Sequence, residues 1–135
     1  MFSYTPPTDF LRGKTILITG ASDGIGKQCA QTFAQFGAKL ILIGRSQEKL
    51  EALFDEIETD HPNSVYIHPM DFITASADDY SEIAHSIDTE FPALDGIIHS
   101  AGLLGARAPI EHYPDSDWSA VIQTNLTAPF MLTKS

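Results

Sequence analysis

The sequence predicts an α/β fold in which helices cover both faces of a parallel sheet. Four short apolar segments, typical of buried strands, alternate with helical segments of about ten to fifteen residues. Such alternation builds β-α-β units, whose strands run parallel and whose crossovers are right-handed. The length of 135 residues suits one domain with its own hydrophobic core.

The predicted elements follow one another in a regular order. Strands are assigned to short apolar runs, and helices to longer segments with apolar residues at three- and four-residue spacing. In chain order these are a strand at 14–19, a helix at about 24–36, a strand at 39–43, a helix from 47 to about 59, a strand at 65–68, a helix at about 76–90, a strand at 94–99 and a helix from about 115 to the chain end. Residues 1–9 precede them as an irregular arm.

The first two strand–helix units carry clear local signals. Residues 15–19 are apolar and β-branched, which is the composition of a fully buried strand. One side of the first helix is expected to pack on the sheet. That side comprises Ile25, Ala30, Phe33 and Ala34. Ser46 is placed to cap the second helix, but Lys49 stands where a capping box would have Glu, so no full box is predicted.

The later helices are bounded by charged residues and proline. Asp78 and Asp79 are assigned to the solvent face of the third helix, which Pro92 ends. Asp115 and Asp117 favour the start of the last helix, because its N-terminus carries a partial positive charge.

The composition narrows the classes of partner. Eight basic residues against 18 acidic ones give a formal charge of −10, which argues against nucleic acid or an anionic membrane as partner. The single cysteine, Cys29, cannot form an internal disulfide, and this favours a reducing, cytoplasmic setting. The N-terminus lacks the basic and apolar regions of a signal peptide, and no apolar run approaches a membrane span.

A glycine-rich turn separates the first strand from the first helix. Gly20, Gly24 and Gly26 lie between the two elements in the spacing G-x-x-x-G-x-G. A strand, a glycine turn and a helix N-terminus make an anion site, because free N–H groups point at the ligand and absent side chains let a pyrophosphate approach. On its own, the glycine spacing is equally consistent with an ordinary tight turn.

Several further motifs give the chain a family resemblance. The segment TGASDGIG (19–26), Asp71, His-Ser-Ala-Gly (99–102) and Asn125 occur in the order of the short-chain dehydrogenase/reductase family. The chain resembles a bacterial branch of it, the YciK-like group, often labelled as oxoacyl-carrier-protein reductases. The resemblance covers residues 11–135, so it includes nearly the whole chain.

The resemblance implies a fold and a set of cofactor residues. The fold is a doubly wound Rossmann-type sheet with strand order 3-2-1-4. The chain would be one dinucleotide-binding domain, residues 1–135, forming the N-terminal part of a longer family fold. The residues assigned to the cofactor are Gly20, Ser22, Asp23, Gly24, Ile25, Gly26, Arg45, Ser46, Asp71, Phe72, Ser100, Ala101 and Gly102. Among them Asp23 is unusual beside a phosphate, and its side chain is expected to point into solvent.

The residues after the second strand favour NADP over NAD. NAD-binding folds have an acid there that binds the ribose 2′-hydroxyl. This chain has Gly44-Arg45-Ser46 instead. A guanidinium can bind a phosphate with two hydrogen bonds, so Arg45 indicates a 2′-phosphate. The alternative is a solvated surface arginine.

Residues after the third and fourth strands are assigned to the adenine side and the cofactor backbone. The resemblance implies that Asp71 accepts a hydrogen bond from the adenine amino group, and that Phe72 lines the adenine slot. Locally, an Asx turn explains Asp71 equally well. Ala101 and Gly102 match a motif that keeps the backbone close to the cofactor. His99 differs from the usual asparagine and is interpreted as a packed histidine rather than an acid–base group.

Asn125 is the one catalytic residue that the resemblance assigns. In the family, its backbone carbonyl holds a proton-relay water within a bent helix. Pro129, four residues later, cannot donate to the carbonyl of Asn125 and clashes with it, so a bend is predicted from the sequence as well. The alternative is a kink with consequences for packing only.

The family's remaining catalytic motif is not found among these residues. In the family, hydride transfer uses a catalytic serine and a Tyr-x-x-x-Lys, which both lie beyond the helix that carries the asparagine. Ser135 does not match that serine, and none of Tyr4, Tyr66, Tyr80 and Tyr113 has lysine four positions later. The expected function is NADP-dependent oxidation or reduction of a small carbonyl or hydroxyl substrate in a full-length form, with this piece inactive alone. The alternative is a complete, non-catalytic dinucleotide-binding or dimerising module. No metal-ligand spacing is recognised.

The last helix and the fourth strand suggest self-association. An apolar stripe runs along the helix, made of Trp118, Val121, Ile122, Leu126 and Phe130. Its plain interpretation is core packing, and the family adds a dimer face along this helix. The run 94–99 would be an exposed sheet edge with few blocking charges. A homo-oligomer is therefore expected.

Overall fold

Four parallel strands form one sheet in the order β3-β2-β1-β4 in the computed structural model, which describes residues 4–135. Strands β1 (Thr15–Thr19) and β2 (Lys39–Gly44) are central, and β3 (Val65–Pro69) and β4 (Gly96–His99) flank them. All three pairings are parallel. The predicted α/β class and the strand order 3-2-1-4 are confirmed.

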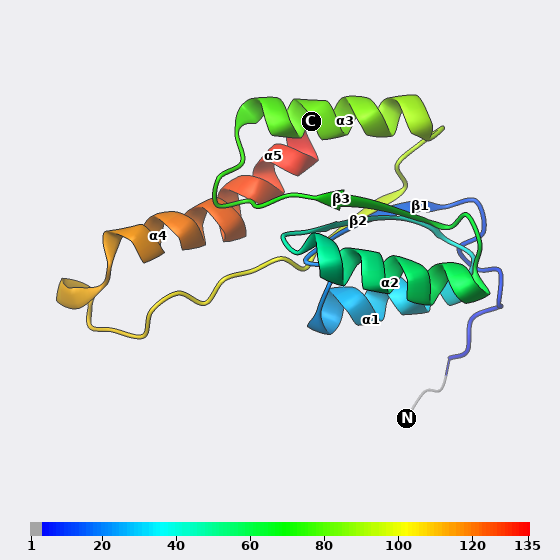
Figure 1. Ribbon diagram of the computed structural model, residues 1–135, viewed down its shortest axis with the longest axis horizontal. Coiled ribbons are helices and arrows are strands. Elements are labelled where there is room, and N and C mark those ends of the chain that lie inside the picture. The colour runs from blue at the N-terminus through cyan, green and yellow to red at the C-terminus, as the bar shows by residue number, and fades with distance from the viewer. Residues whose placement is uncertain (1–3) are drawn as a thin grey trace.

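Helices cover both faces of the sheet, as Figure 1 shows. Helices α1 (Gly24–Gln35) and α2 (Gln47–Asp60) lie against one face. Helices α3 (Ala77–Glu90) and α5 (Ala128–Lys134) lie against the other, while α4 (Asp115–Ile122) extends away from the sheet. The alternation of strand and helix in the sequence therefore produces the expected three-layer arrangement.

Each face of the sheet has its own hydrophobic core. On β2, Leu40 and Leu42 point toward α1 and α2, whereas Ile41 and Ile43 point toward α3 and α5. All four side chains are at most 3% exposed. Successive strand residues face opposite sides, so a strand with helices on both faces must be apolar throughout.

Serine side chains begin two of the helices. Ser46 accepts a hydrogen bond from the backbone N–H of Lys49 at 3.3 Å, which confirms its predicted capping of α2. Ser76 caps α3, and Asp79 completes a capping box by accepting from the Ser76 backbone at 2.7 Å. Asp79 therefore faces solvent, as expected, and also stabilises the first turn of α3. This capping role was not predicted from the sequence.

The C-terminal third differs from the sequence prediction. The last helix is three segments: α4, then the π-helical segment η2 (Gln123–Thr127), then α5. Within η2 the backbone N–H of Ala128 donates to the carbonyl of Gln123, five residues earlier. Pro129 follows directly and has no N–H to restore the α-helical pattern. A short 3₁₀ turn, η1 (Ile110–His112), lies in the loop before α4.

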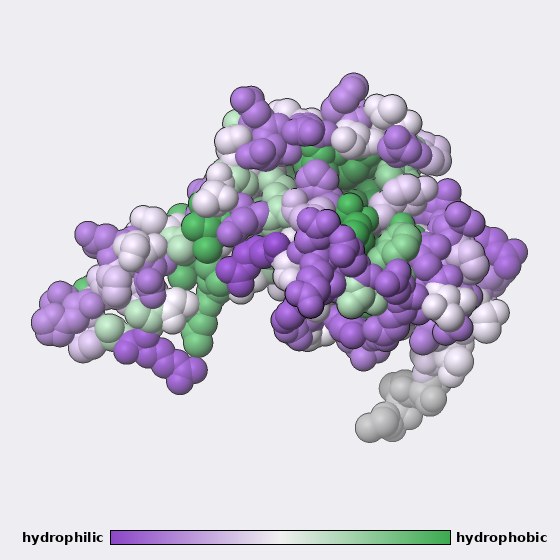
Figure 2. All heavy atoms as spheres, in the orientation of Figure 1, coloured by the Kyte–Doolittle hydropathy of each residue, from purple (hydrophilic) through white to green (hydrophobic). Residues whose placement is uncertain are grey.

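Two expectations about packing are wrong. Ile25 was expected to pack on the sheet, but it is 77% exposed. The plain core interpretation of the helical stripe also fails for Trp118, Leu126 and Phe130, which are each about 60% exposed. Figure 2 shows apolar residues at the surface of the segment that α4 and η2 form.

Two remaining observations concern the N-terminal arm and the character of the helices. Residues 1–3 of the predicted irregular arm lie outside the described residues, and residues 4–9 form no helix or strand. Within residues 4–135, no helix combines the length and apolar character that crossing a membrane requires.

Candidate functional site

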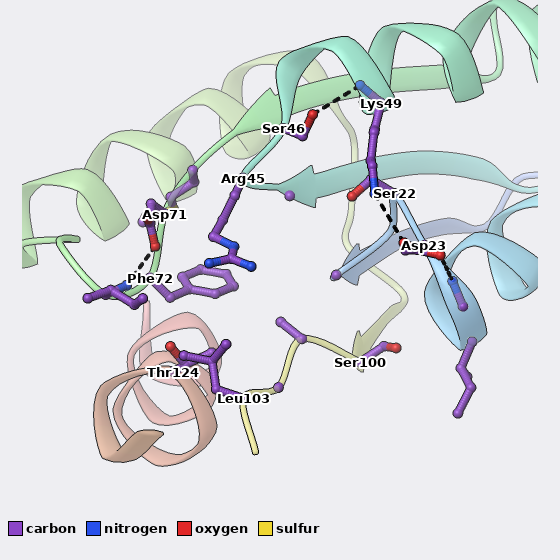
Figure 3. A pocket seen from close by; sticks show the side chains of 18 residues that line it. Ser22, Asp23, Arg45, Ser46, Lys49, Asp71, Phe72, Ser100, Leu103 and Thr124 are labelled. Carbon is purple, nitrogen blue, oxygen red and sulfur yellow. Dashed lines mark hydrogen bonds and ion pairs between the residues drawn. The ribbon is translucent and has the colours of Figure 1, made fainter. Parts of the chain in front are cut away.

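A cavity of about 700 Å³ opens at the carboxyl ends of the strands. Residues from five separate parts of the chain line it (Figure 3). They are Gly20, Ser22, Asp23, Gly24, Ile25, Gly44, Arg45, Ser46, Lys49, Met70, Asp71, Phe72, Ile73, Ser100, Ala101, Gly102, Leu103 and Thr124. In open parallel sheets, this crevice outside the strand ends is where ligands bind.

The glycine turn is shaped by backbone contacts that exclude side chains. Gly20 has a positive φ of 62°, and a Cβ added there would lie 2.8 Å from the Cα of Ala101. A Cβ on Gly26 would overlap the carbonyl oxygen of Gly20. Gly24 also has a positive φ, 48°, but a Cβ there would meet no atom within 4 Å. Gly20 and Gly26 therefore keep the turn tight, and Gly24 supplies its backbone conformation.

A buried hydroxyl joins this turn to the loop after β4. The side-chain oxygen of Thr19 accepts hydrogen bonds from the backbone N–H groups of Ser100 and Ala101, both at 3.1 Å. Thr19 is 2% exposed, so these bonds are shielded from water. Thr19 is the first residue of the TGASDGIG motif, but its place in the sequence does not reveal this role.

Arg45 and Ser46 lie at the end of β2, at one side of the cavity. The guanidinium of Arg45 points into the cavity in Figure 3, and Arg45 makes no ion pair with residues 4–135. The glycine turn contributes Asp23 to the same cavity, and its carboxylate pairs with Lys49 at 3.1 Å. A cation without a partner in a cavity is suited to binding an anion.

Asp23 differs in part from its expected arrangement. Its side chain is 82% exposed, as expected, but it is also held in place. One carboxylate oxygen accepts from the backbone N–H of Gly24 at 2.8 Å and so caps α1. The hydrogen bond from Lys49 and then that from Gly24 hold the pKa of Asp23 below its ordinary value. The carboxylate is therefore ionised at neutral pH.

Asp71 and Phe72 form the side of the cavity opposite the glycine turn. One oxygen of Asp71 accepts from the backbone N–H of Ile73 at 3.0 Å, which is the Asx turn that the sequence left open. Phe72 is 4% exposed, and its ring is parallel to that of Tyr80 with centroids 6.3 Å apart. Both residues line the cavity, so the turn and an adenine contact are compatible.

Asn125 ties the π-helical segment to the loop after β4. Its amide nitrogen donates to the backbone carbonyl of Leu103, and its amide oxygen accepts from the Leu103 N–H, both at 2.8 Å. On the neighbouring residue, the Thr124 hydroxyl is buried without a hydrogen-bond partner and lines the cavity. The side chain of Asn125 therefore positions the loop after β4. Any chemical role of Asn125 is then left to its backbone carbonyl.

The predicted cofactor residues gather in one place, with one exception. All of them except Gly26 line the cavity, and Gly26 lies behind the turn. That they bind a cofactor remains a prediction. His99 was interpreted as packed, which is wrong: it is exposed, and its Nε2 lies 3.1 Å from the hydroxyl of Thr133. Among residues 4–135, no group of three His, Cys, Asp or Glu side chains could hold a metal ion.

Sequence analysis missed several lining residues. They are Gly44, Lys49, Met70, Ile73, Leu103 and Thr124. Only Lys49 had a visible signal, because it stands where a capping box would have Glu. The others are apolar or small residues whose place in the cavity depends on how distant segments meet.

Comparison with known proteins assigns the chain and its fold to a family. The family model described as short chain dehydrogenase matches residues 14–135. This chain belongs to the short chain dehydrogenase family. It is 39% identical over 132 residues to YciK of Escherichia coli K12, named as an uncharacterized oxidoreductase, and this match covers 98% of the chain. The resemblance stated from the sequence is confirmed.

Solved structures of this family show the same fold. A short chain dehydrogenase from Salmonella enterica serovar Typhi superposes with a TM-score of 0.93 at 40% identity, covering 97% of this chain and 54% of that one. A protein from Escherichia coli CFT073, described as a short chain dehydrogenase complexed with NADPH, gives 0.90 at 40% identity, covering 96% and 54%. The match to YciK covers 52% of that protein. The chain thus spans about half the length of the relatives it matches.

Replacing Gly26 with alanine tests the packing of the glycine turn. The new Cβ would overlap the carbonyl oxygen of Gly20, so α1 must move away from the turn. We expect Gly26→Ala to lower the free energy of unfolding by about 1–3 kcal/mol, as overpacking does. Gly13→Ala is the control, because Gly13 lies outside the cavity and an added Cβ there meets open space, so the variant costs only about 1–2 kcal/mol for its positive φ of 76°.

Denaturant unfolding measures both free energies, and nucleotide binding reports on the turn. Gly26→Ala should lose binding even at temperatures where it remains folded. Equal binding by the two variants would show that the close contact between Gly20 and Gly26 does not shape the site.

Proposed function

We propose that this chain is the cofactor-binding part of an NADP-dependent oxidoreductase that acts on a small carbonyl or hydroxyl compound. One observation carries the proposal. A glycine turn at a helix N-terminus and a guanidinium at the end of β2, which forms no ion pair within residues 4–135, face the same cavity. These are the two features that a dinucleotide with an additional phosphate requires.

The residues present fit the parts of this cofactor. Side chains are excluded at Gly20, which leaves the backbone and the α1 N-terminus open to a pyrophosphate. We assign the adenine to the side of Asp71 and Phe72, and the 2′-phosphate to Arg45 and Ser46. When bound, NADP supplies or accepts the hydride, and the protein residues bind and orient it.

The choice of NADP over NAD depends on charge at the end of β2. A carboxylate there would accept hydrogen bonds from ribose hydroxyls and repel a phosphate. Arg45 instead offers up to five N–H donors and a permanent positive charge. The solved relative complexed with NADPH supports this choice. The single Cys29 supports a reducing, cytoplasmic setting.

The Arg45→Asp variant tests the cofactor assignment. A charge-assisted hydrogen bond contributes about 1.5–3 kcal/mol, so NADPH should bind the parent chain about ten- to a hundred-fold more tightly than NADH. Arg45→Asp should abolish or invert that ratio, as measured by fluorescence titration. Arg12→Asp makes the same charge change on an exposed residue outside the cavity and should preserve the ratio. Equal affinities in the parent chain would contradict the assignment.

Asn125 is assigned to the chemical step through its backbone. Its side chain is occupied by both backbone groups of Leu103, and the π-helical segment changes the hydrogen-bond pattern around its carbonyl. We propose that this carbonyl holds a water in a proton relay. The alternative of a kink with only packing consequences predicts no effect on catalysis.

Turnover measurements test the catalytic assignment. We expect the 135-residue polypeptide to bind NADPH without oxidising it in the presence of ketones or acyl thioesters, because it holds no Tyr-x-x-x-Lys. In a longer natural form that turns over, Asn125→Ala should lower kcat more than it weakens cofactor binding. Turnover by pure protein of 135 residues would refute the first expectation and favour a different proton donor.

We further propose that the chain associates with a second copy through the helical stripe. Trp118, Leu126 and Phe130 are exposed along one continuous helical segment, and β4 pairs on one side only among the described strands. Burying such surface is favourable, because about 25 cal/mol is gained for each Å² of apolar area removed from water. The negative net charge limits further aggregation.

Sedimentation at micromolar concentration measures this association. The parent chain should be a dimer or larger, and Leu126→Glu should shift it toward monomer. Phe10→Glu is a matched control, because Phe10 has a similar exposed fraction, 59% against 63%, in a different part of the chain. A parent chain that is monomeric and unchanged by Leu126→Glu would rule out the helical interface.

A further inference from the structure

The cavity holds a second cation that the assignment of Arg45 leaves unexplained. Resting on the function proposed above, we infer that Lys49 binds the 2′-phosphate together with Arg45. Asp23 holds Lys49 at the rim of the cavity until the phosphate takes its place. The proposal thus concerns an exchange of ion-pair partner by Lys49, from a carboxylate of the protein to a phosphate of the ligand.

Lys49 is poorly placed for the helix in which it lies. It is the third residue of α2, whose N-cap is Ser46. The N-terminus of a helix carries a partial positive charge, so a cation there is unfavourable and an acid is preferred. The helix itself gives no reason for a lysine at this position, whereas a negative charge nearby, from Asp23 or from a bound anion, does.

The side chain of Lys49 crosses from α2 to the glycine turn. Its Nζ lies 3.1 Å from the carboxylate of Asp23, and both residues line the cavity. Figure 3 shows Lys49 extending over Ser22 toward Asp23, on the same side of the cavity as Ser46. The ammonium is thus held beside the turn where phosphate groups are expected.

The pair is weak enough to exchange its partner. The side chains of Lys49 and Asp23 are 59% and 82% exposed, so water screens their attraction. A phosphate carries up to two negative charges and three acceptor oxygens, and it can bind both cations at once. Lys49 therefore gains by turning from Asp23 to the phosphate.

The charges that line the cavity favour a second cation beside the phosphate. Two carboxylates line it, Asp23 and Asp71, and two cations, Arg45 and Lys49. Without Lys49 the lining carries one positive and two negative charges, in a chain whose net charge is already −10. A phosphate would then approach a lining of its own sign.

The chain contains a matched pair that does not line the cavity. Lys27 on α1 pairs with Glu56 on α2 at 3.0 Å, with side chains 40% and 48% exposed. This pair joins α1 to α2, and the pair of Asp23 and Lys49 joins the N-cap of α1 to α2. Removing Lys27 therefore breaks a comparable exposed ion pair, whereas Lys27 itself does not line the cavity.

Nucleotide titrations of matched variants test the proposal. Lys49→Gln should weaken NADPH binding about tenfold and change NADH binding less than twofold, whereas Lys27→Gln should change neither. Lys49→Arg should restore most of the affinity. Asp23→Asn keeps an N-cap oxygen but removes the competing charge, so it should bind NADPH several-fold more tightly. Thermal unfolding of each variant verifies that it is folded.

Phosphorus NMR of bound NADP measures the pKa of the 2′-phosphate. A lysine with only a structural role would not change this pKa. A nearby cation lowers the pKa of a phosphate, so Lys49→Gln should raise the pKa of the bound 2′-phosphate and Lys27→Gln should not. An Arg45-dependent preference for NADPH, with Lys49→Gln behaving like Lys27→Gln, would contradict this inference alone. A parent chain that binds neither nucleotide would contradict the proposed function and this inference together.

Discussion

The close contact between the end of β1 and the loop after β4 is the constraint on which the site depends. Thr19 receives two backbone N–H groups from that loop, and Gly20 approaches Ala101 so closely that no side chain fits between them. Strands β1 and β4 are neighbours in the sheet although about 80 residues separate the bonded groups. The contact fixes the base of the cavity, and the helix that follows Gly20 then points its N-terminus into it.

The cavity contains positive groups although the whole chain has a negative net charge. A protein with a net charge of −10 repels anions at long range, so an anionic ligand must be held by groups close to it. The α1 N-terminus, Arg45 and Lys49 supply the positive charge at the cavity, and they come from α1, the turn after β2 and α2. Asp23 stabilises α1 as its cap, but it places a negative charge in the cavity that Lys49 balances.

The π-helical segment η2 is attached to the cavity through the hydrogen bonds of Asn125. Asn125 binds both backbone groups of Leu103, so the position of the helix determines the position of the loop that lines the cavity. Pro129 lacks the N–H that an α-helical pattern would need one turn after Asn125. A local irregularity in the helix thus has a structural consequence about twenty residues away in the sequence.

The sequence by itself determined the four strands, the first three helices and the positions of the short motifs. Apolar runs, the glycine turn and the Ser46 cap depend on neighbours within a few residues, and so they can be recognised without the fold. Periodicity identifies apolar residues but not what covers them, which is why Ile25 was wrongly expected to be buried.

Only the tertiary structure decided which groups meet across the cavity. Asp23 and Lys49 are 26 residues apart, and Leu103 and Asn125 are 22 apart. Their contacts follow from sheet register and helix packing, and no local pattern in the sequence encodes these. The same holds for Thr19, because a buried hydroxyl shows its role only when the backbone groups that bind it are in place.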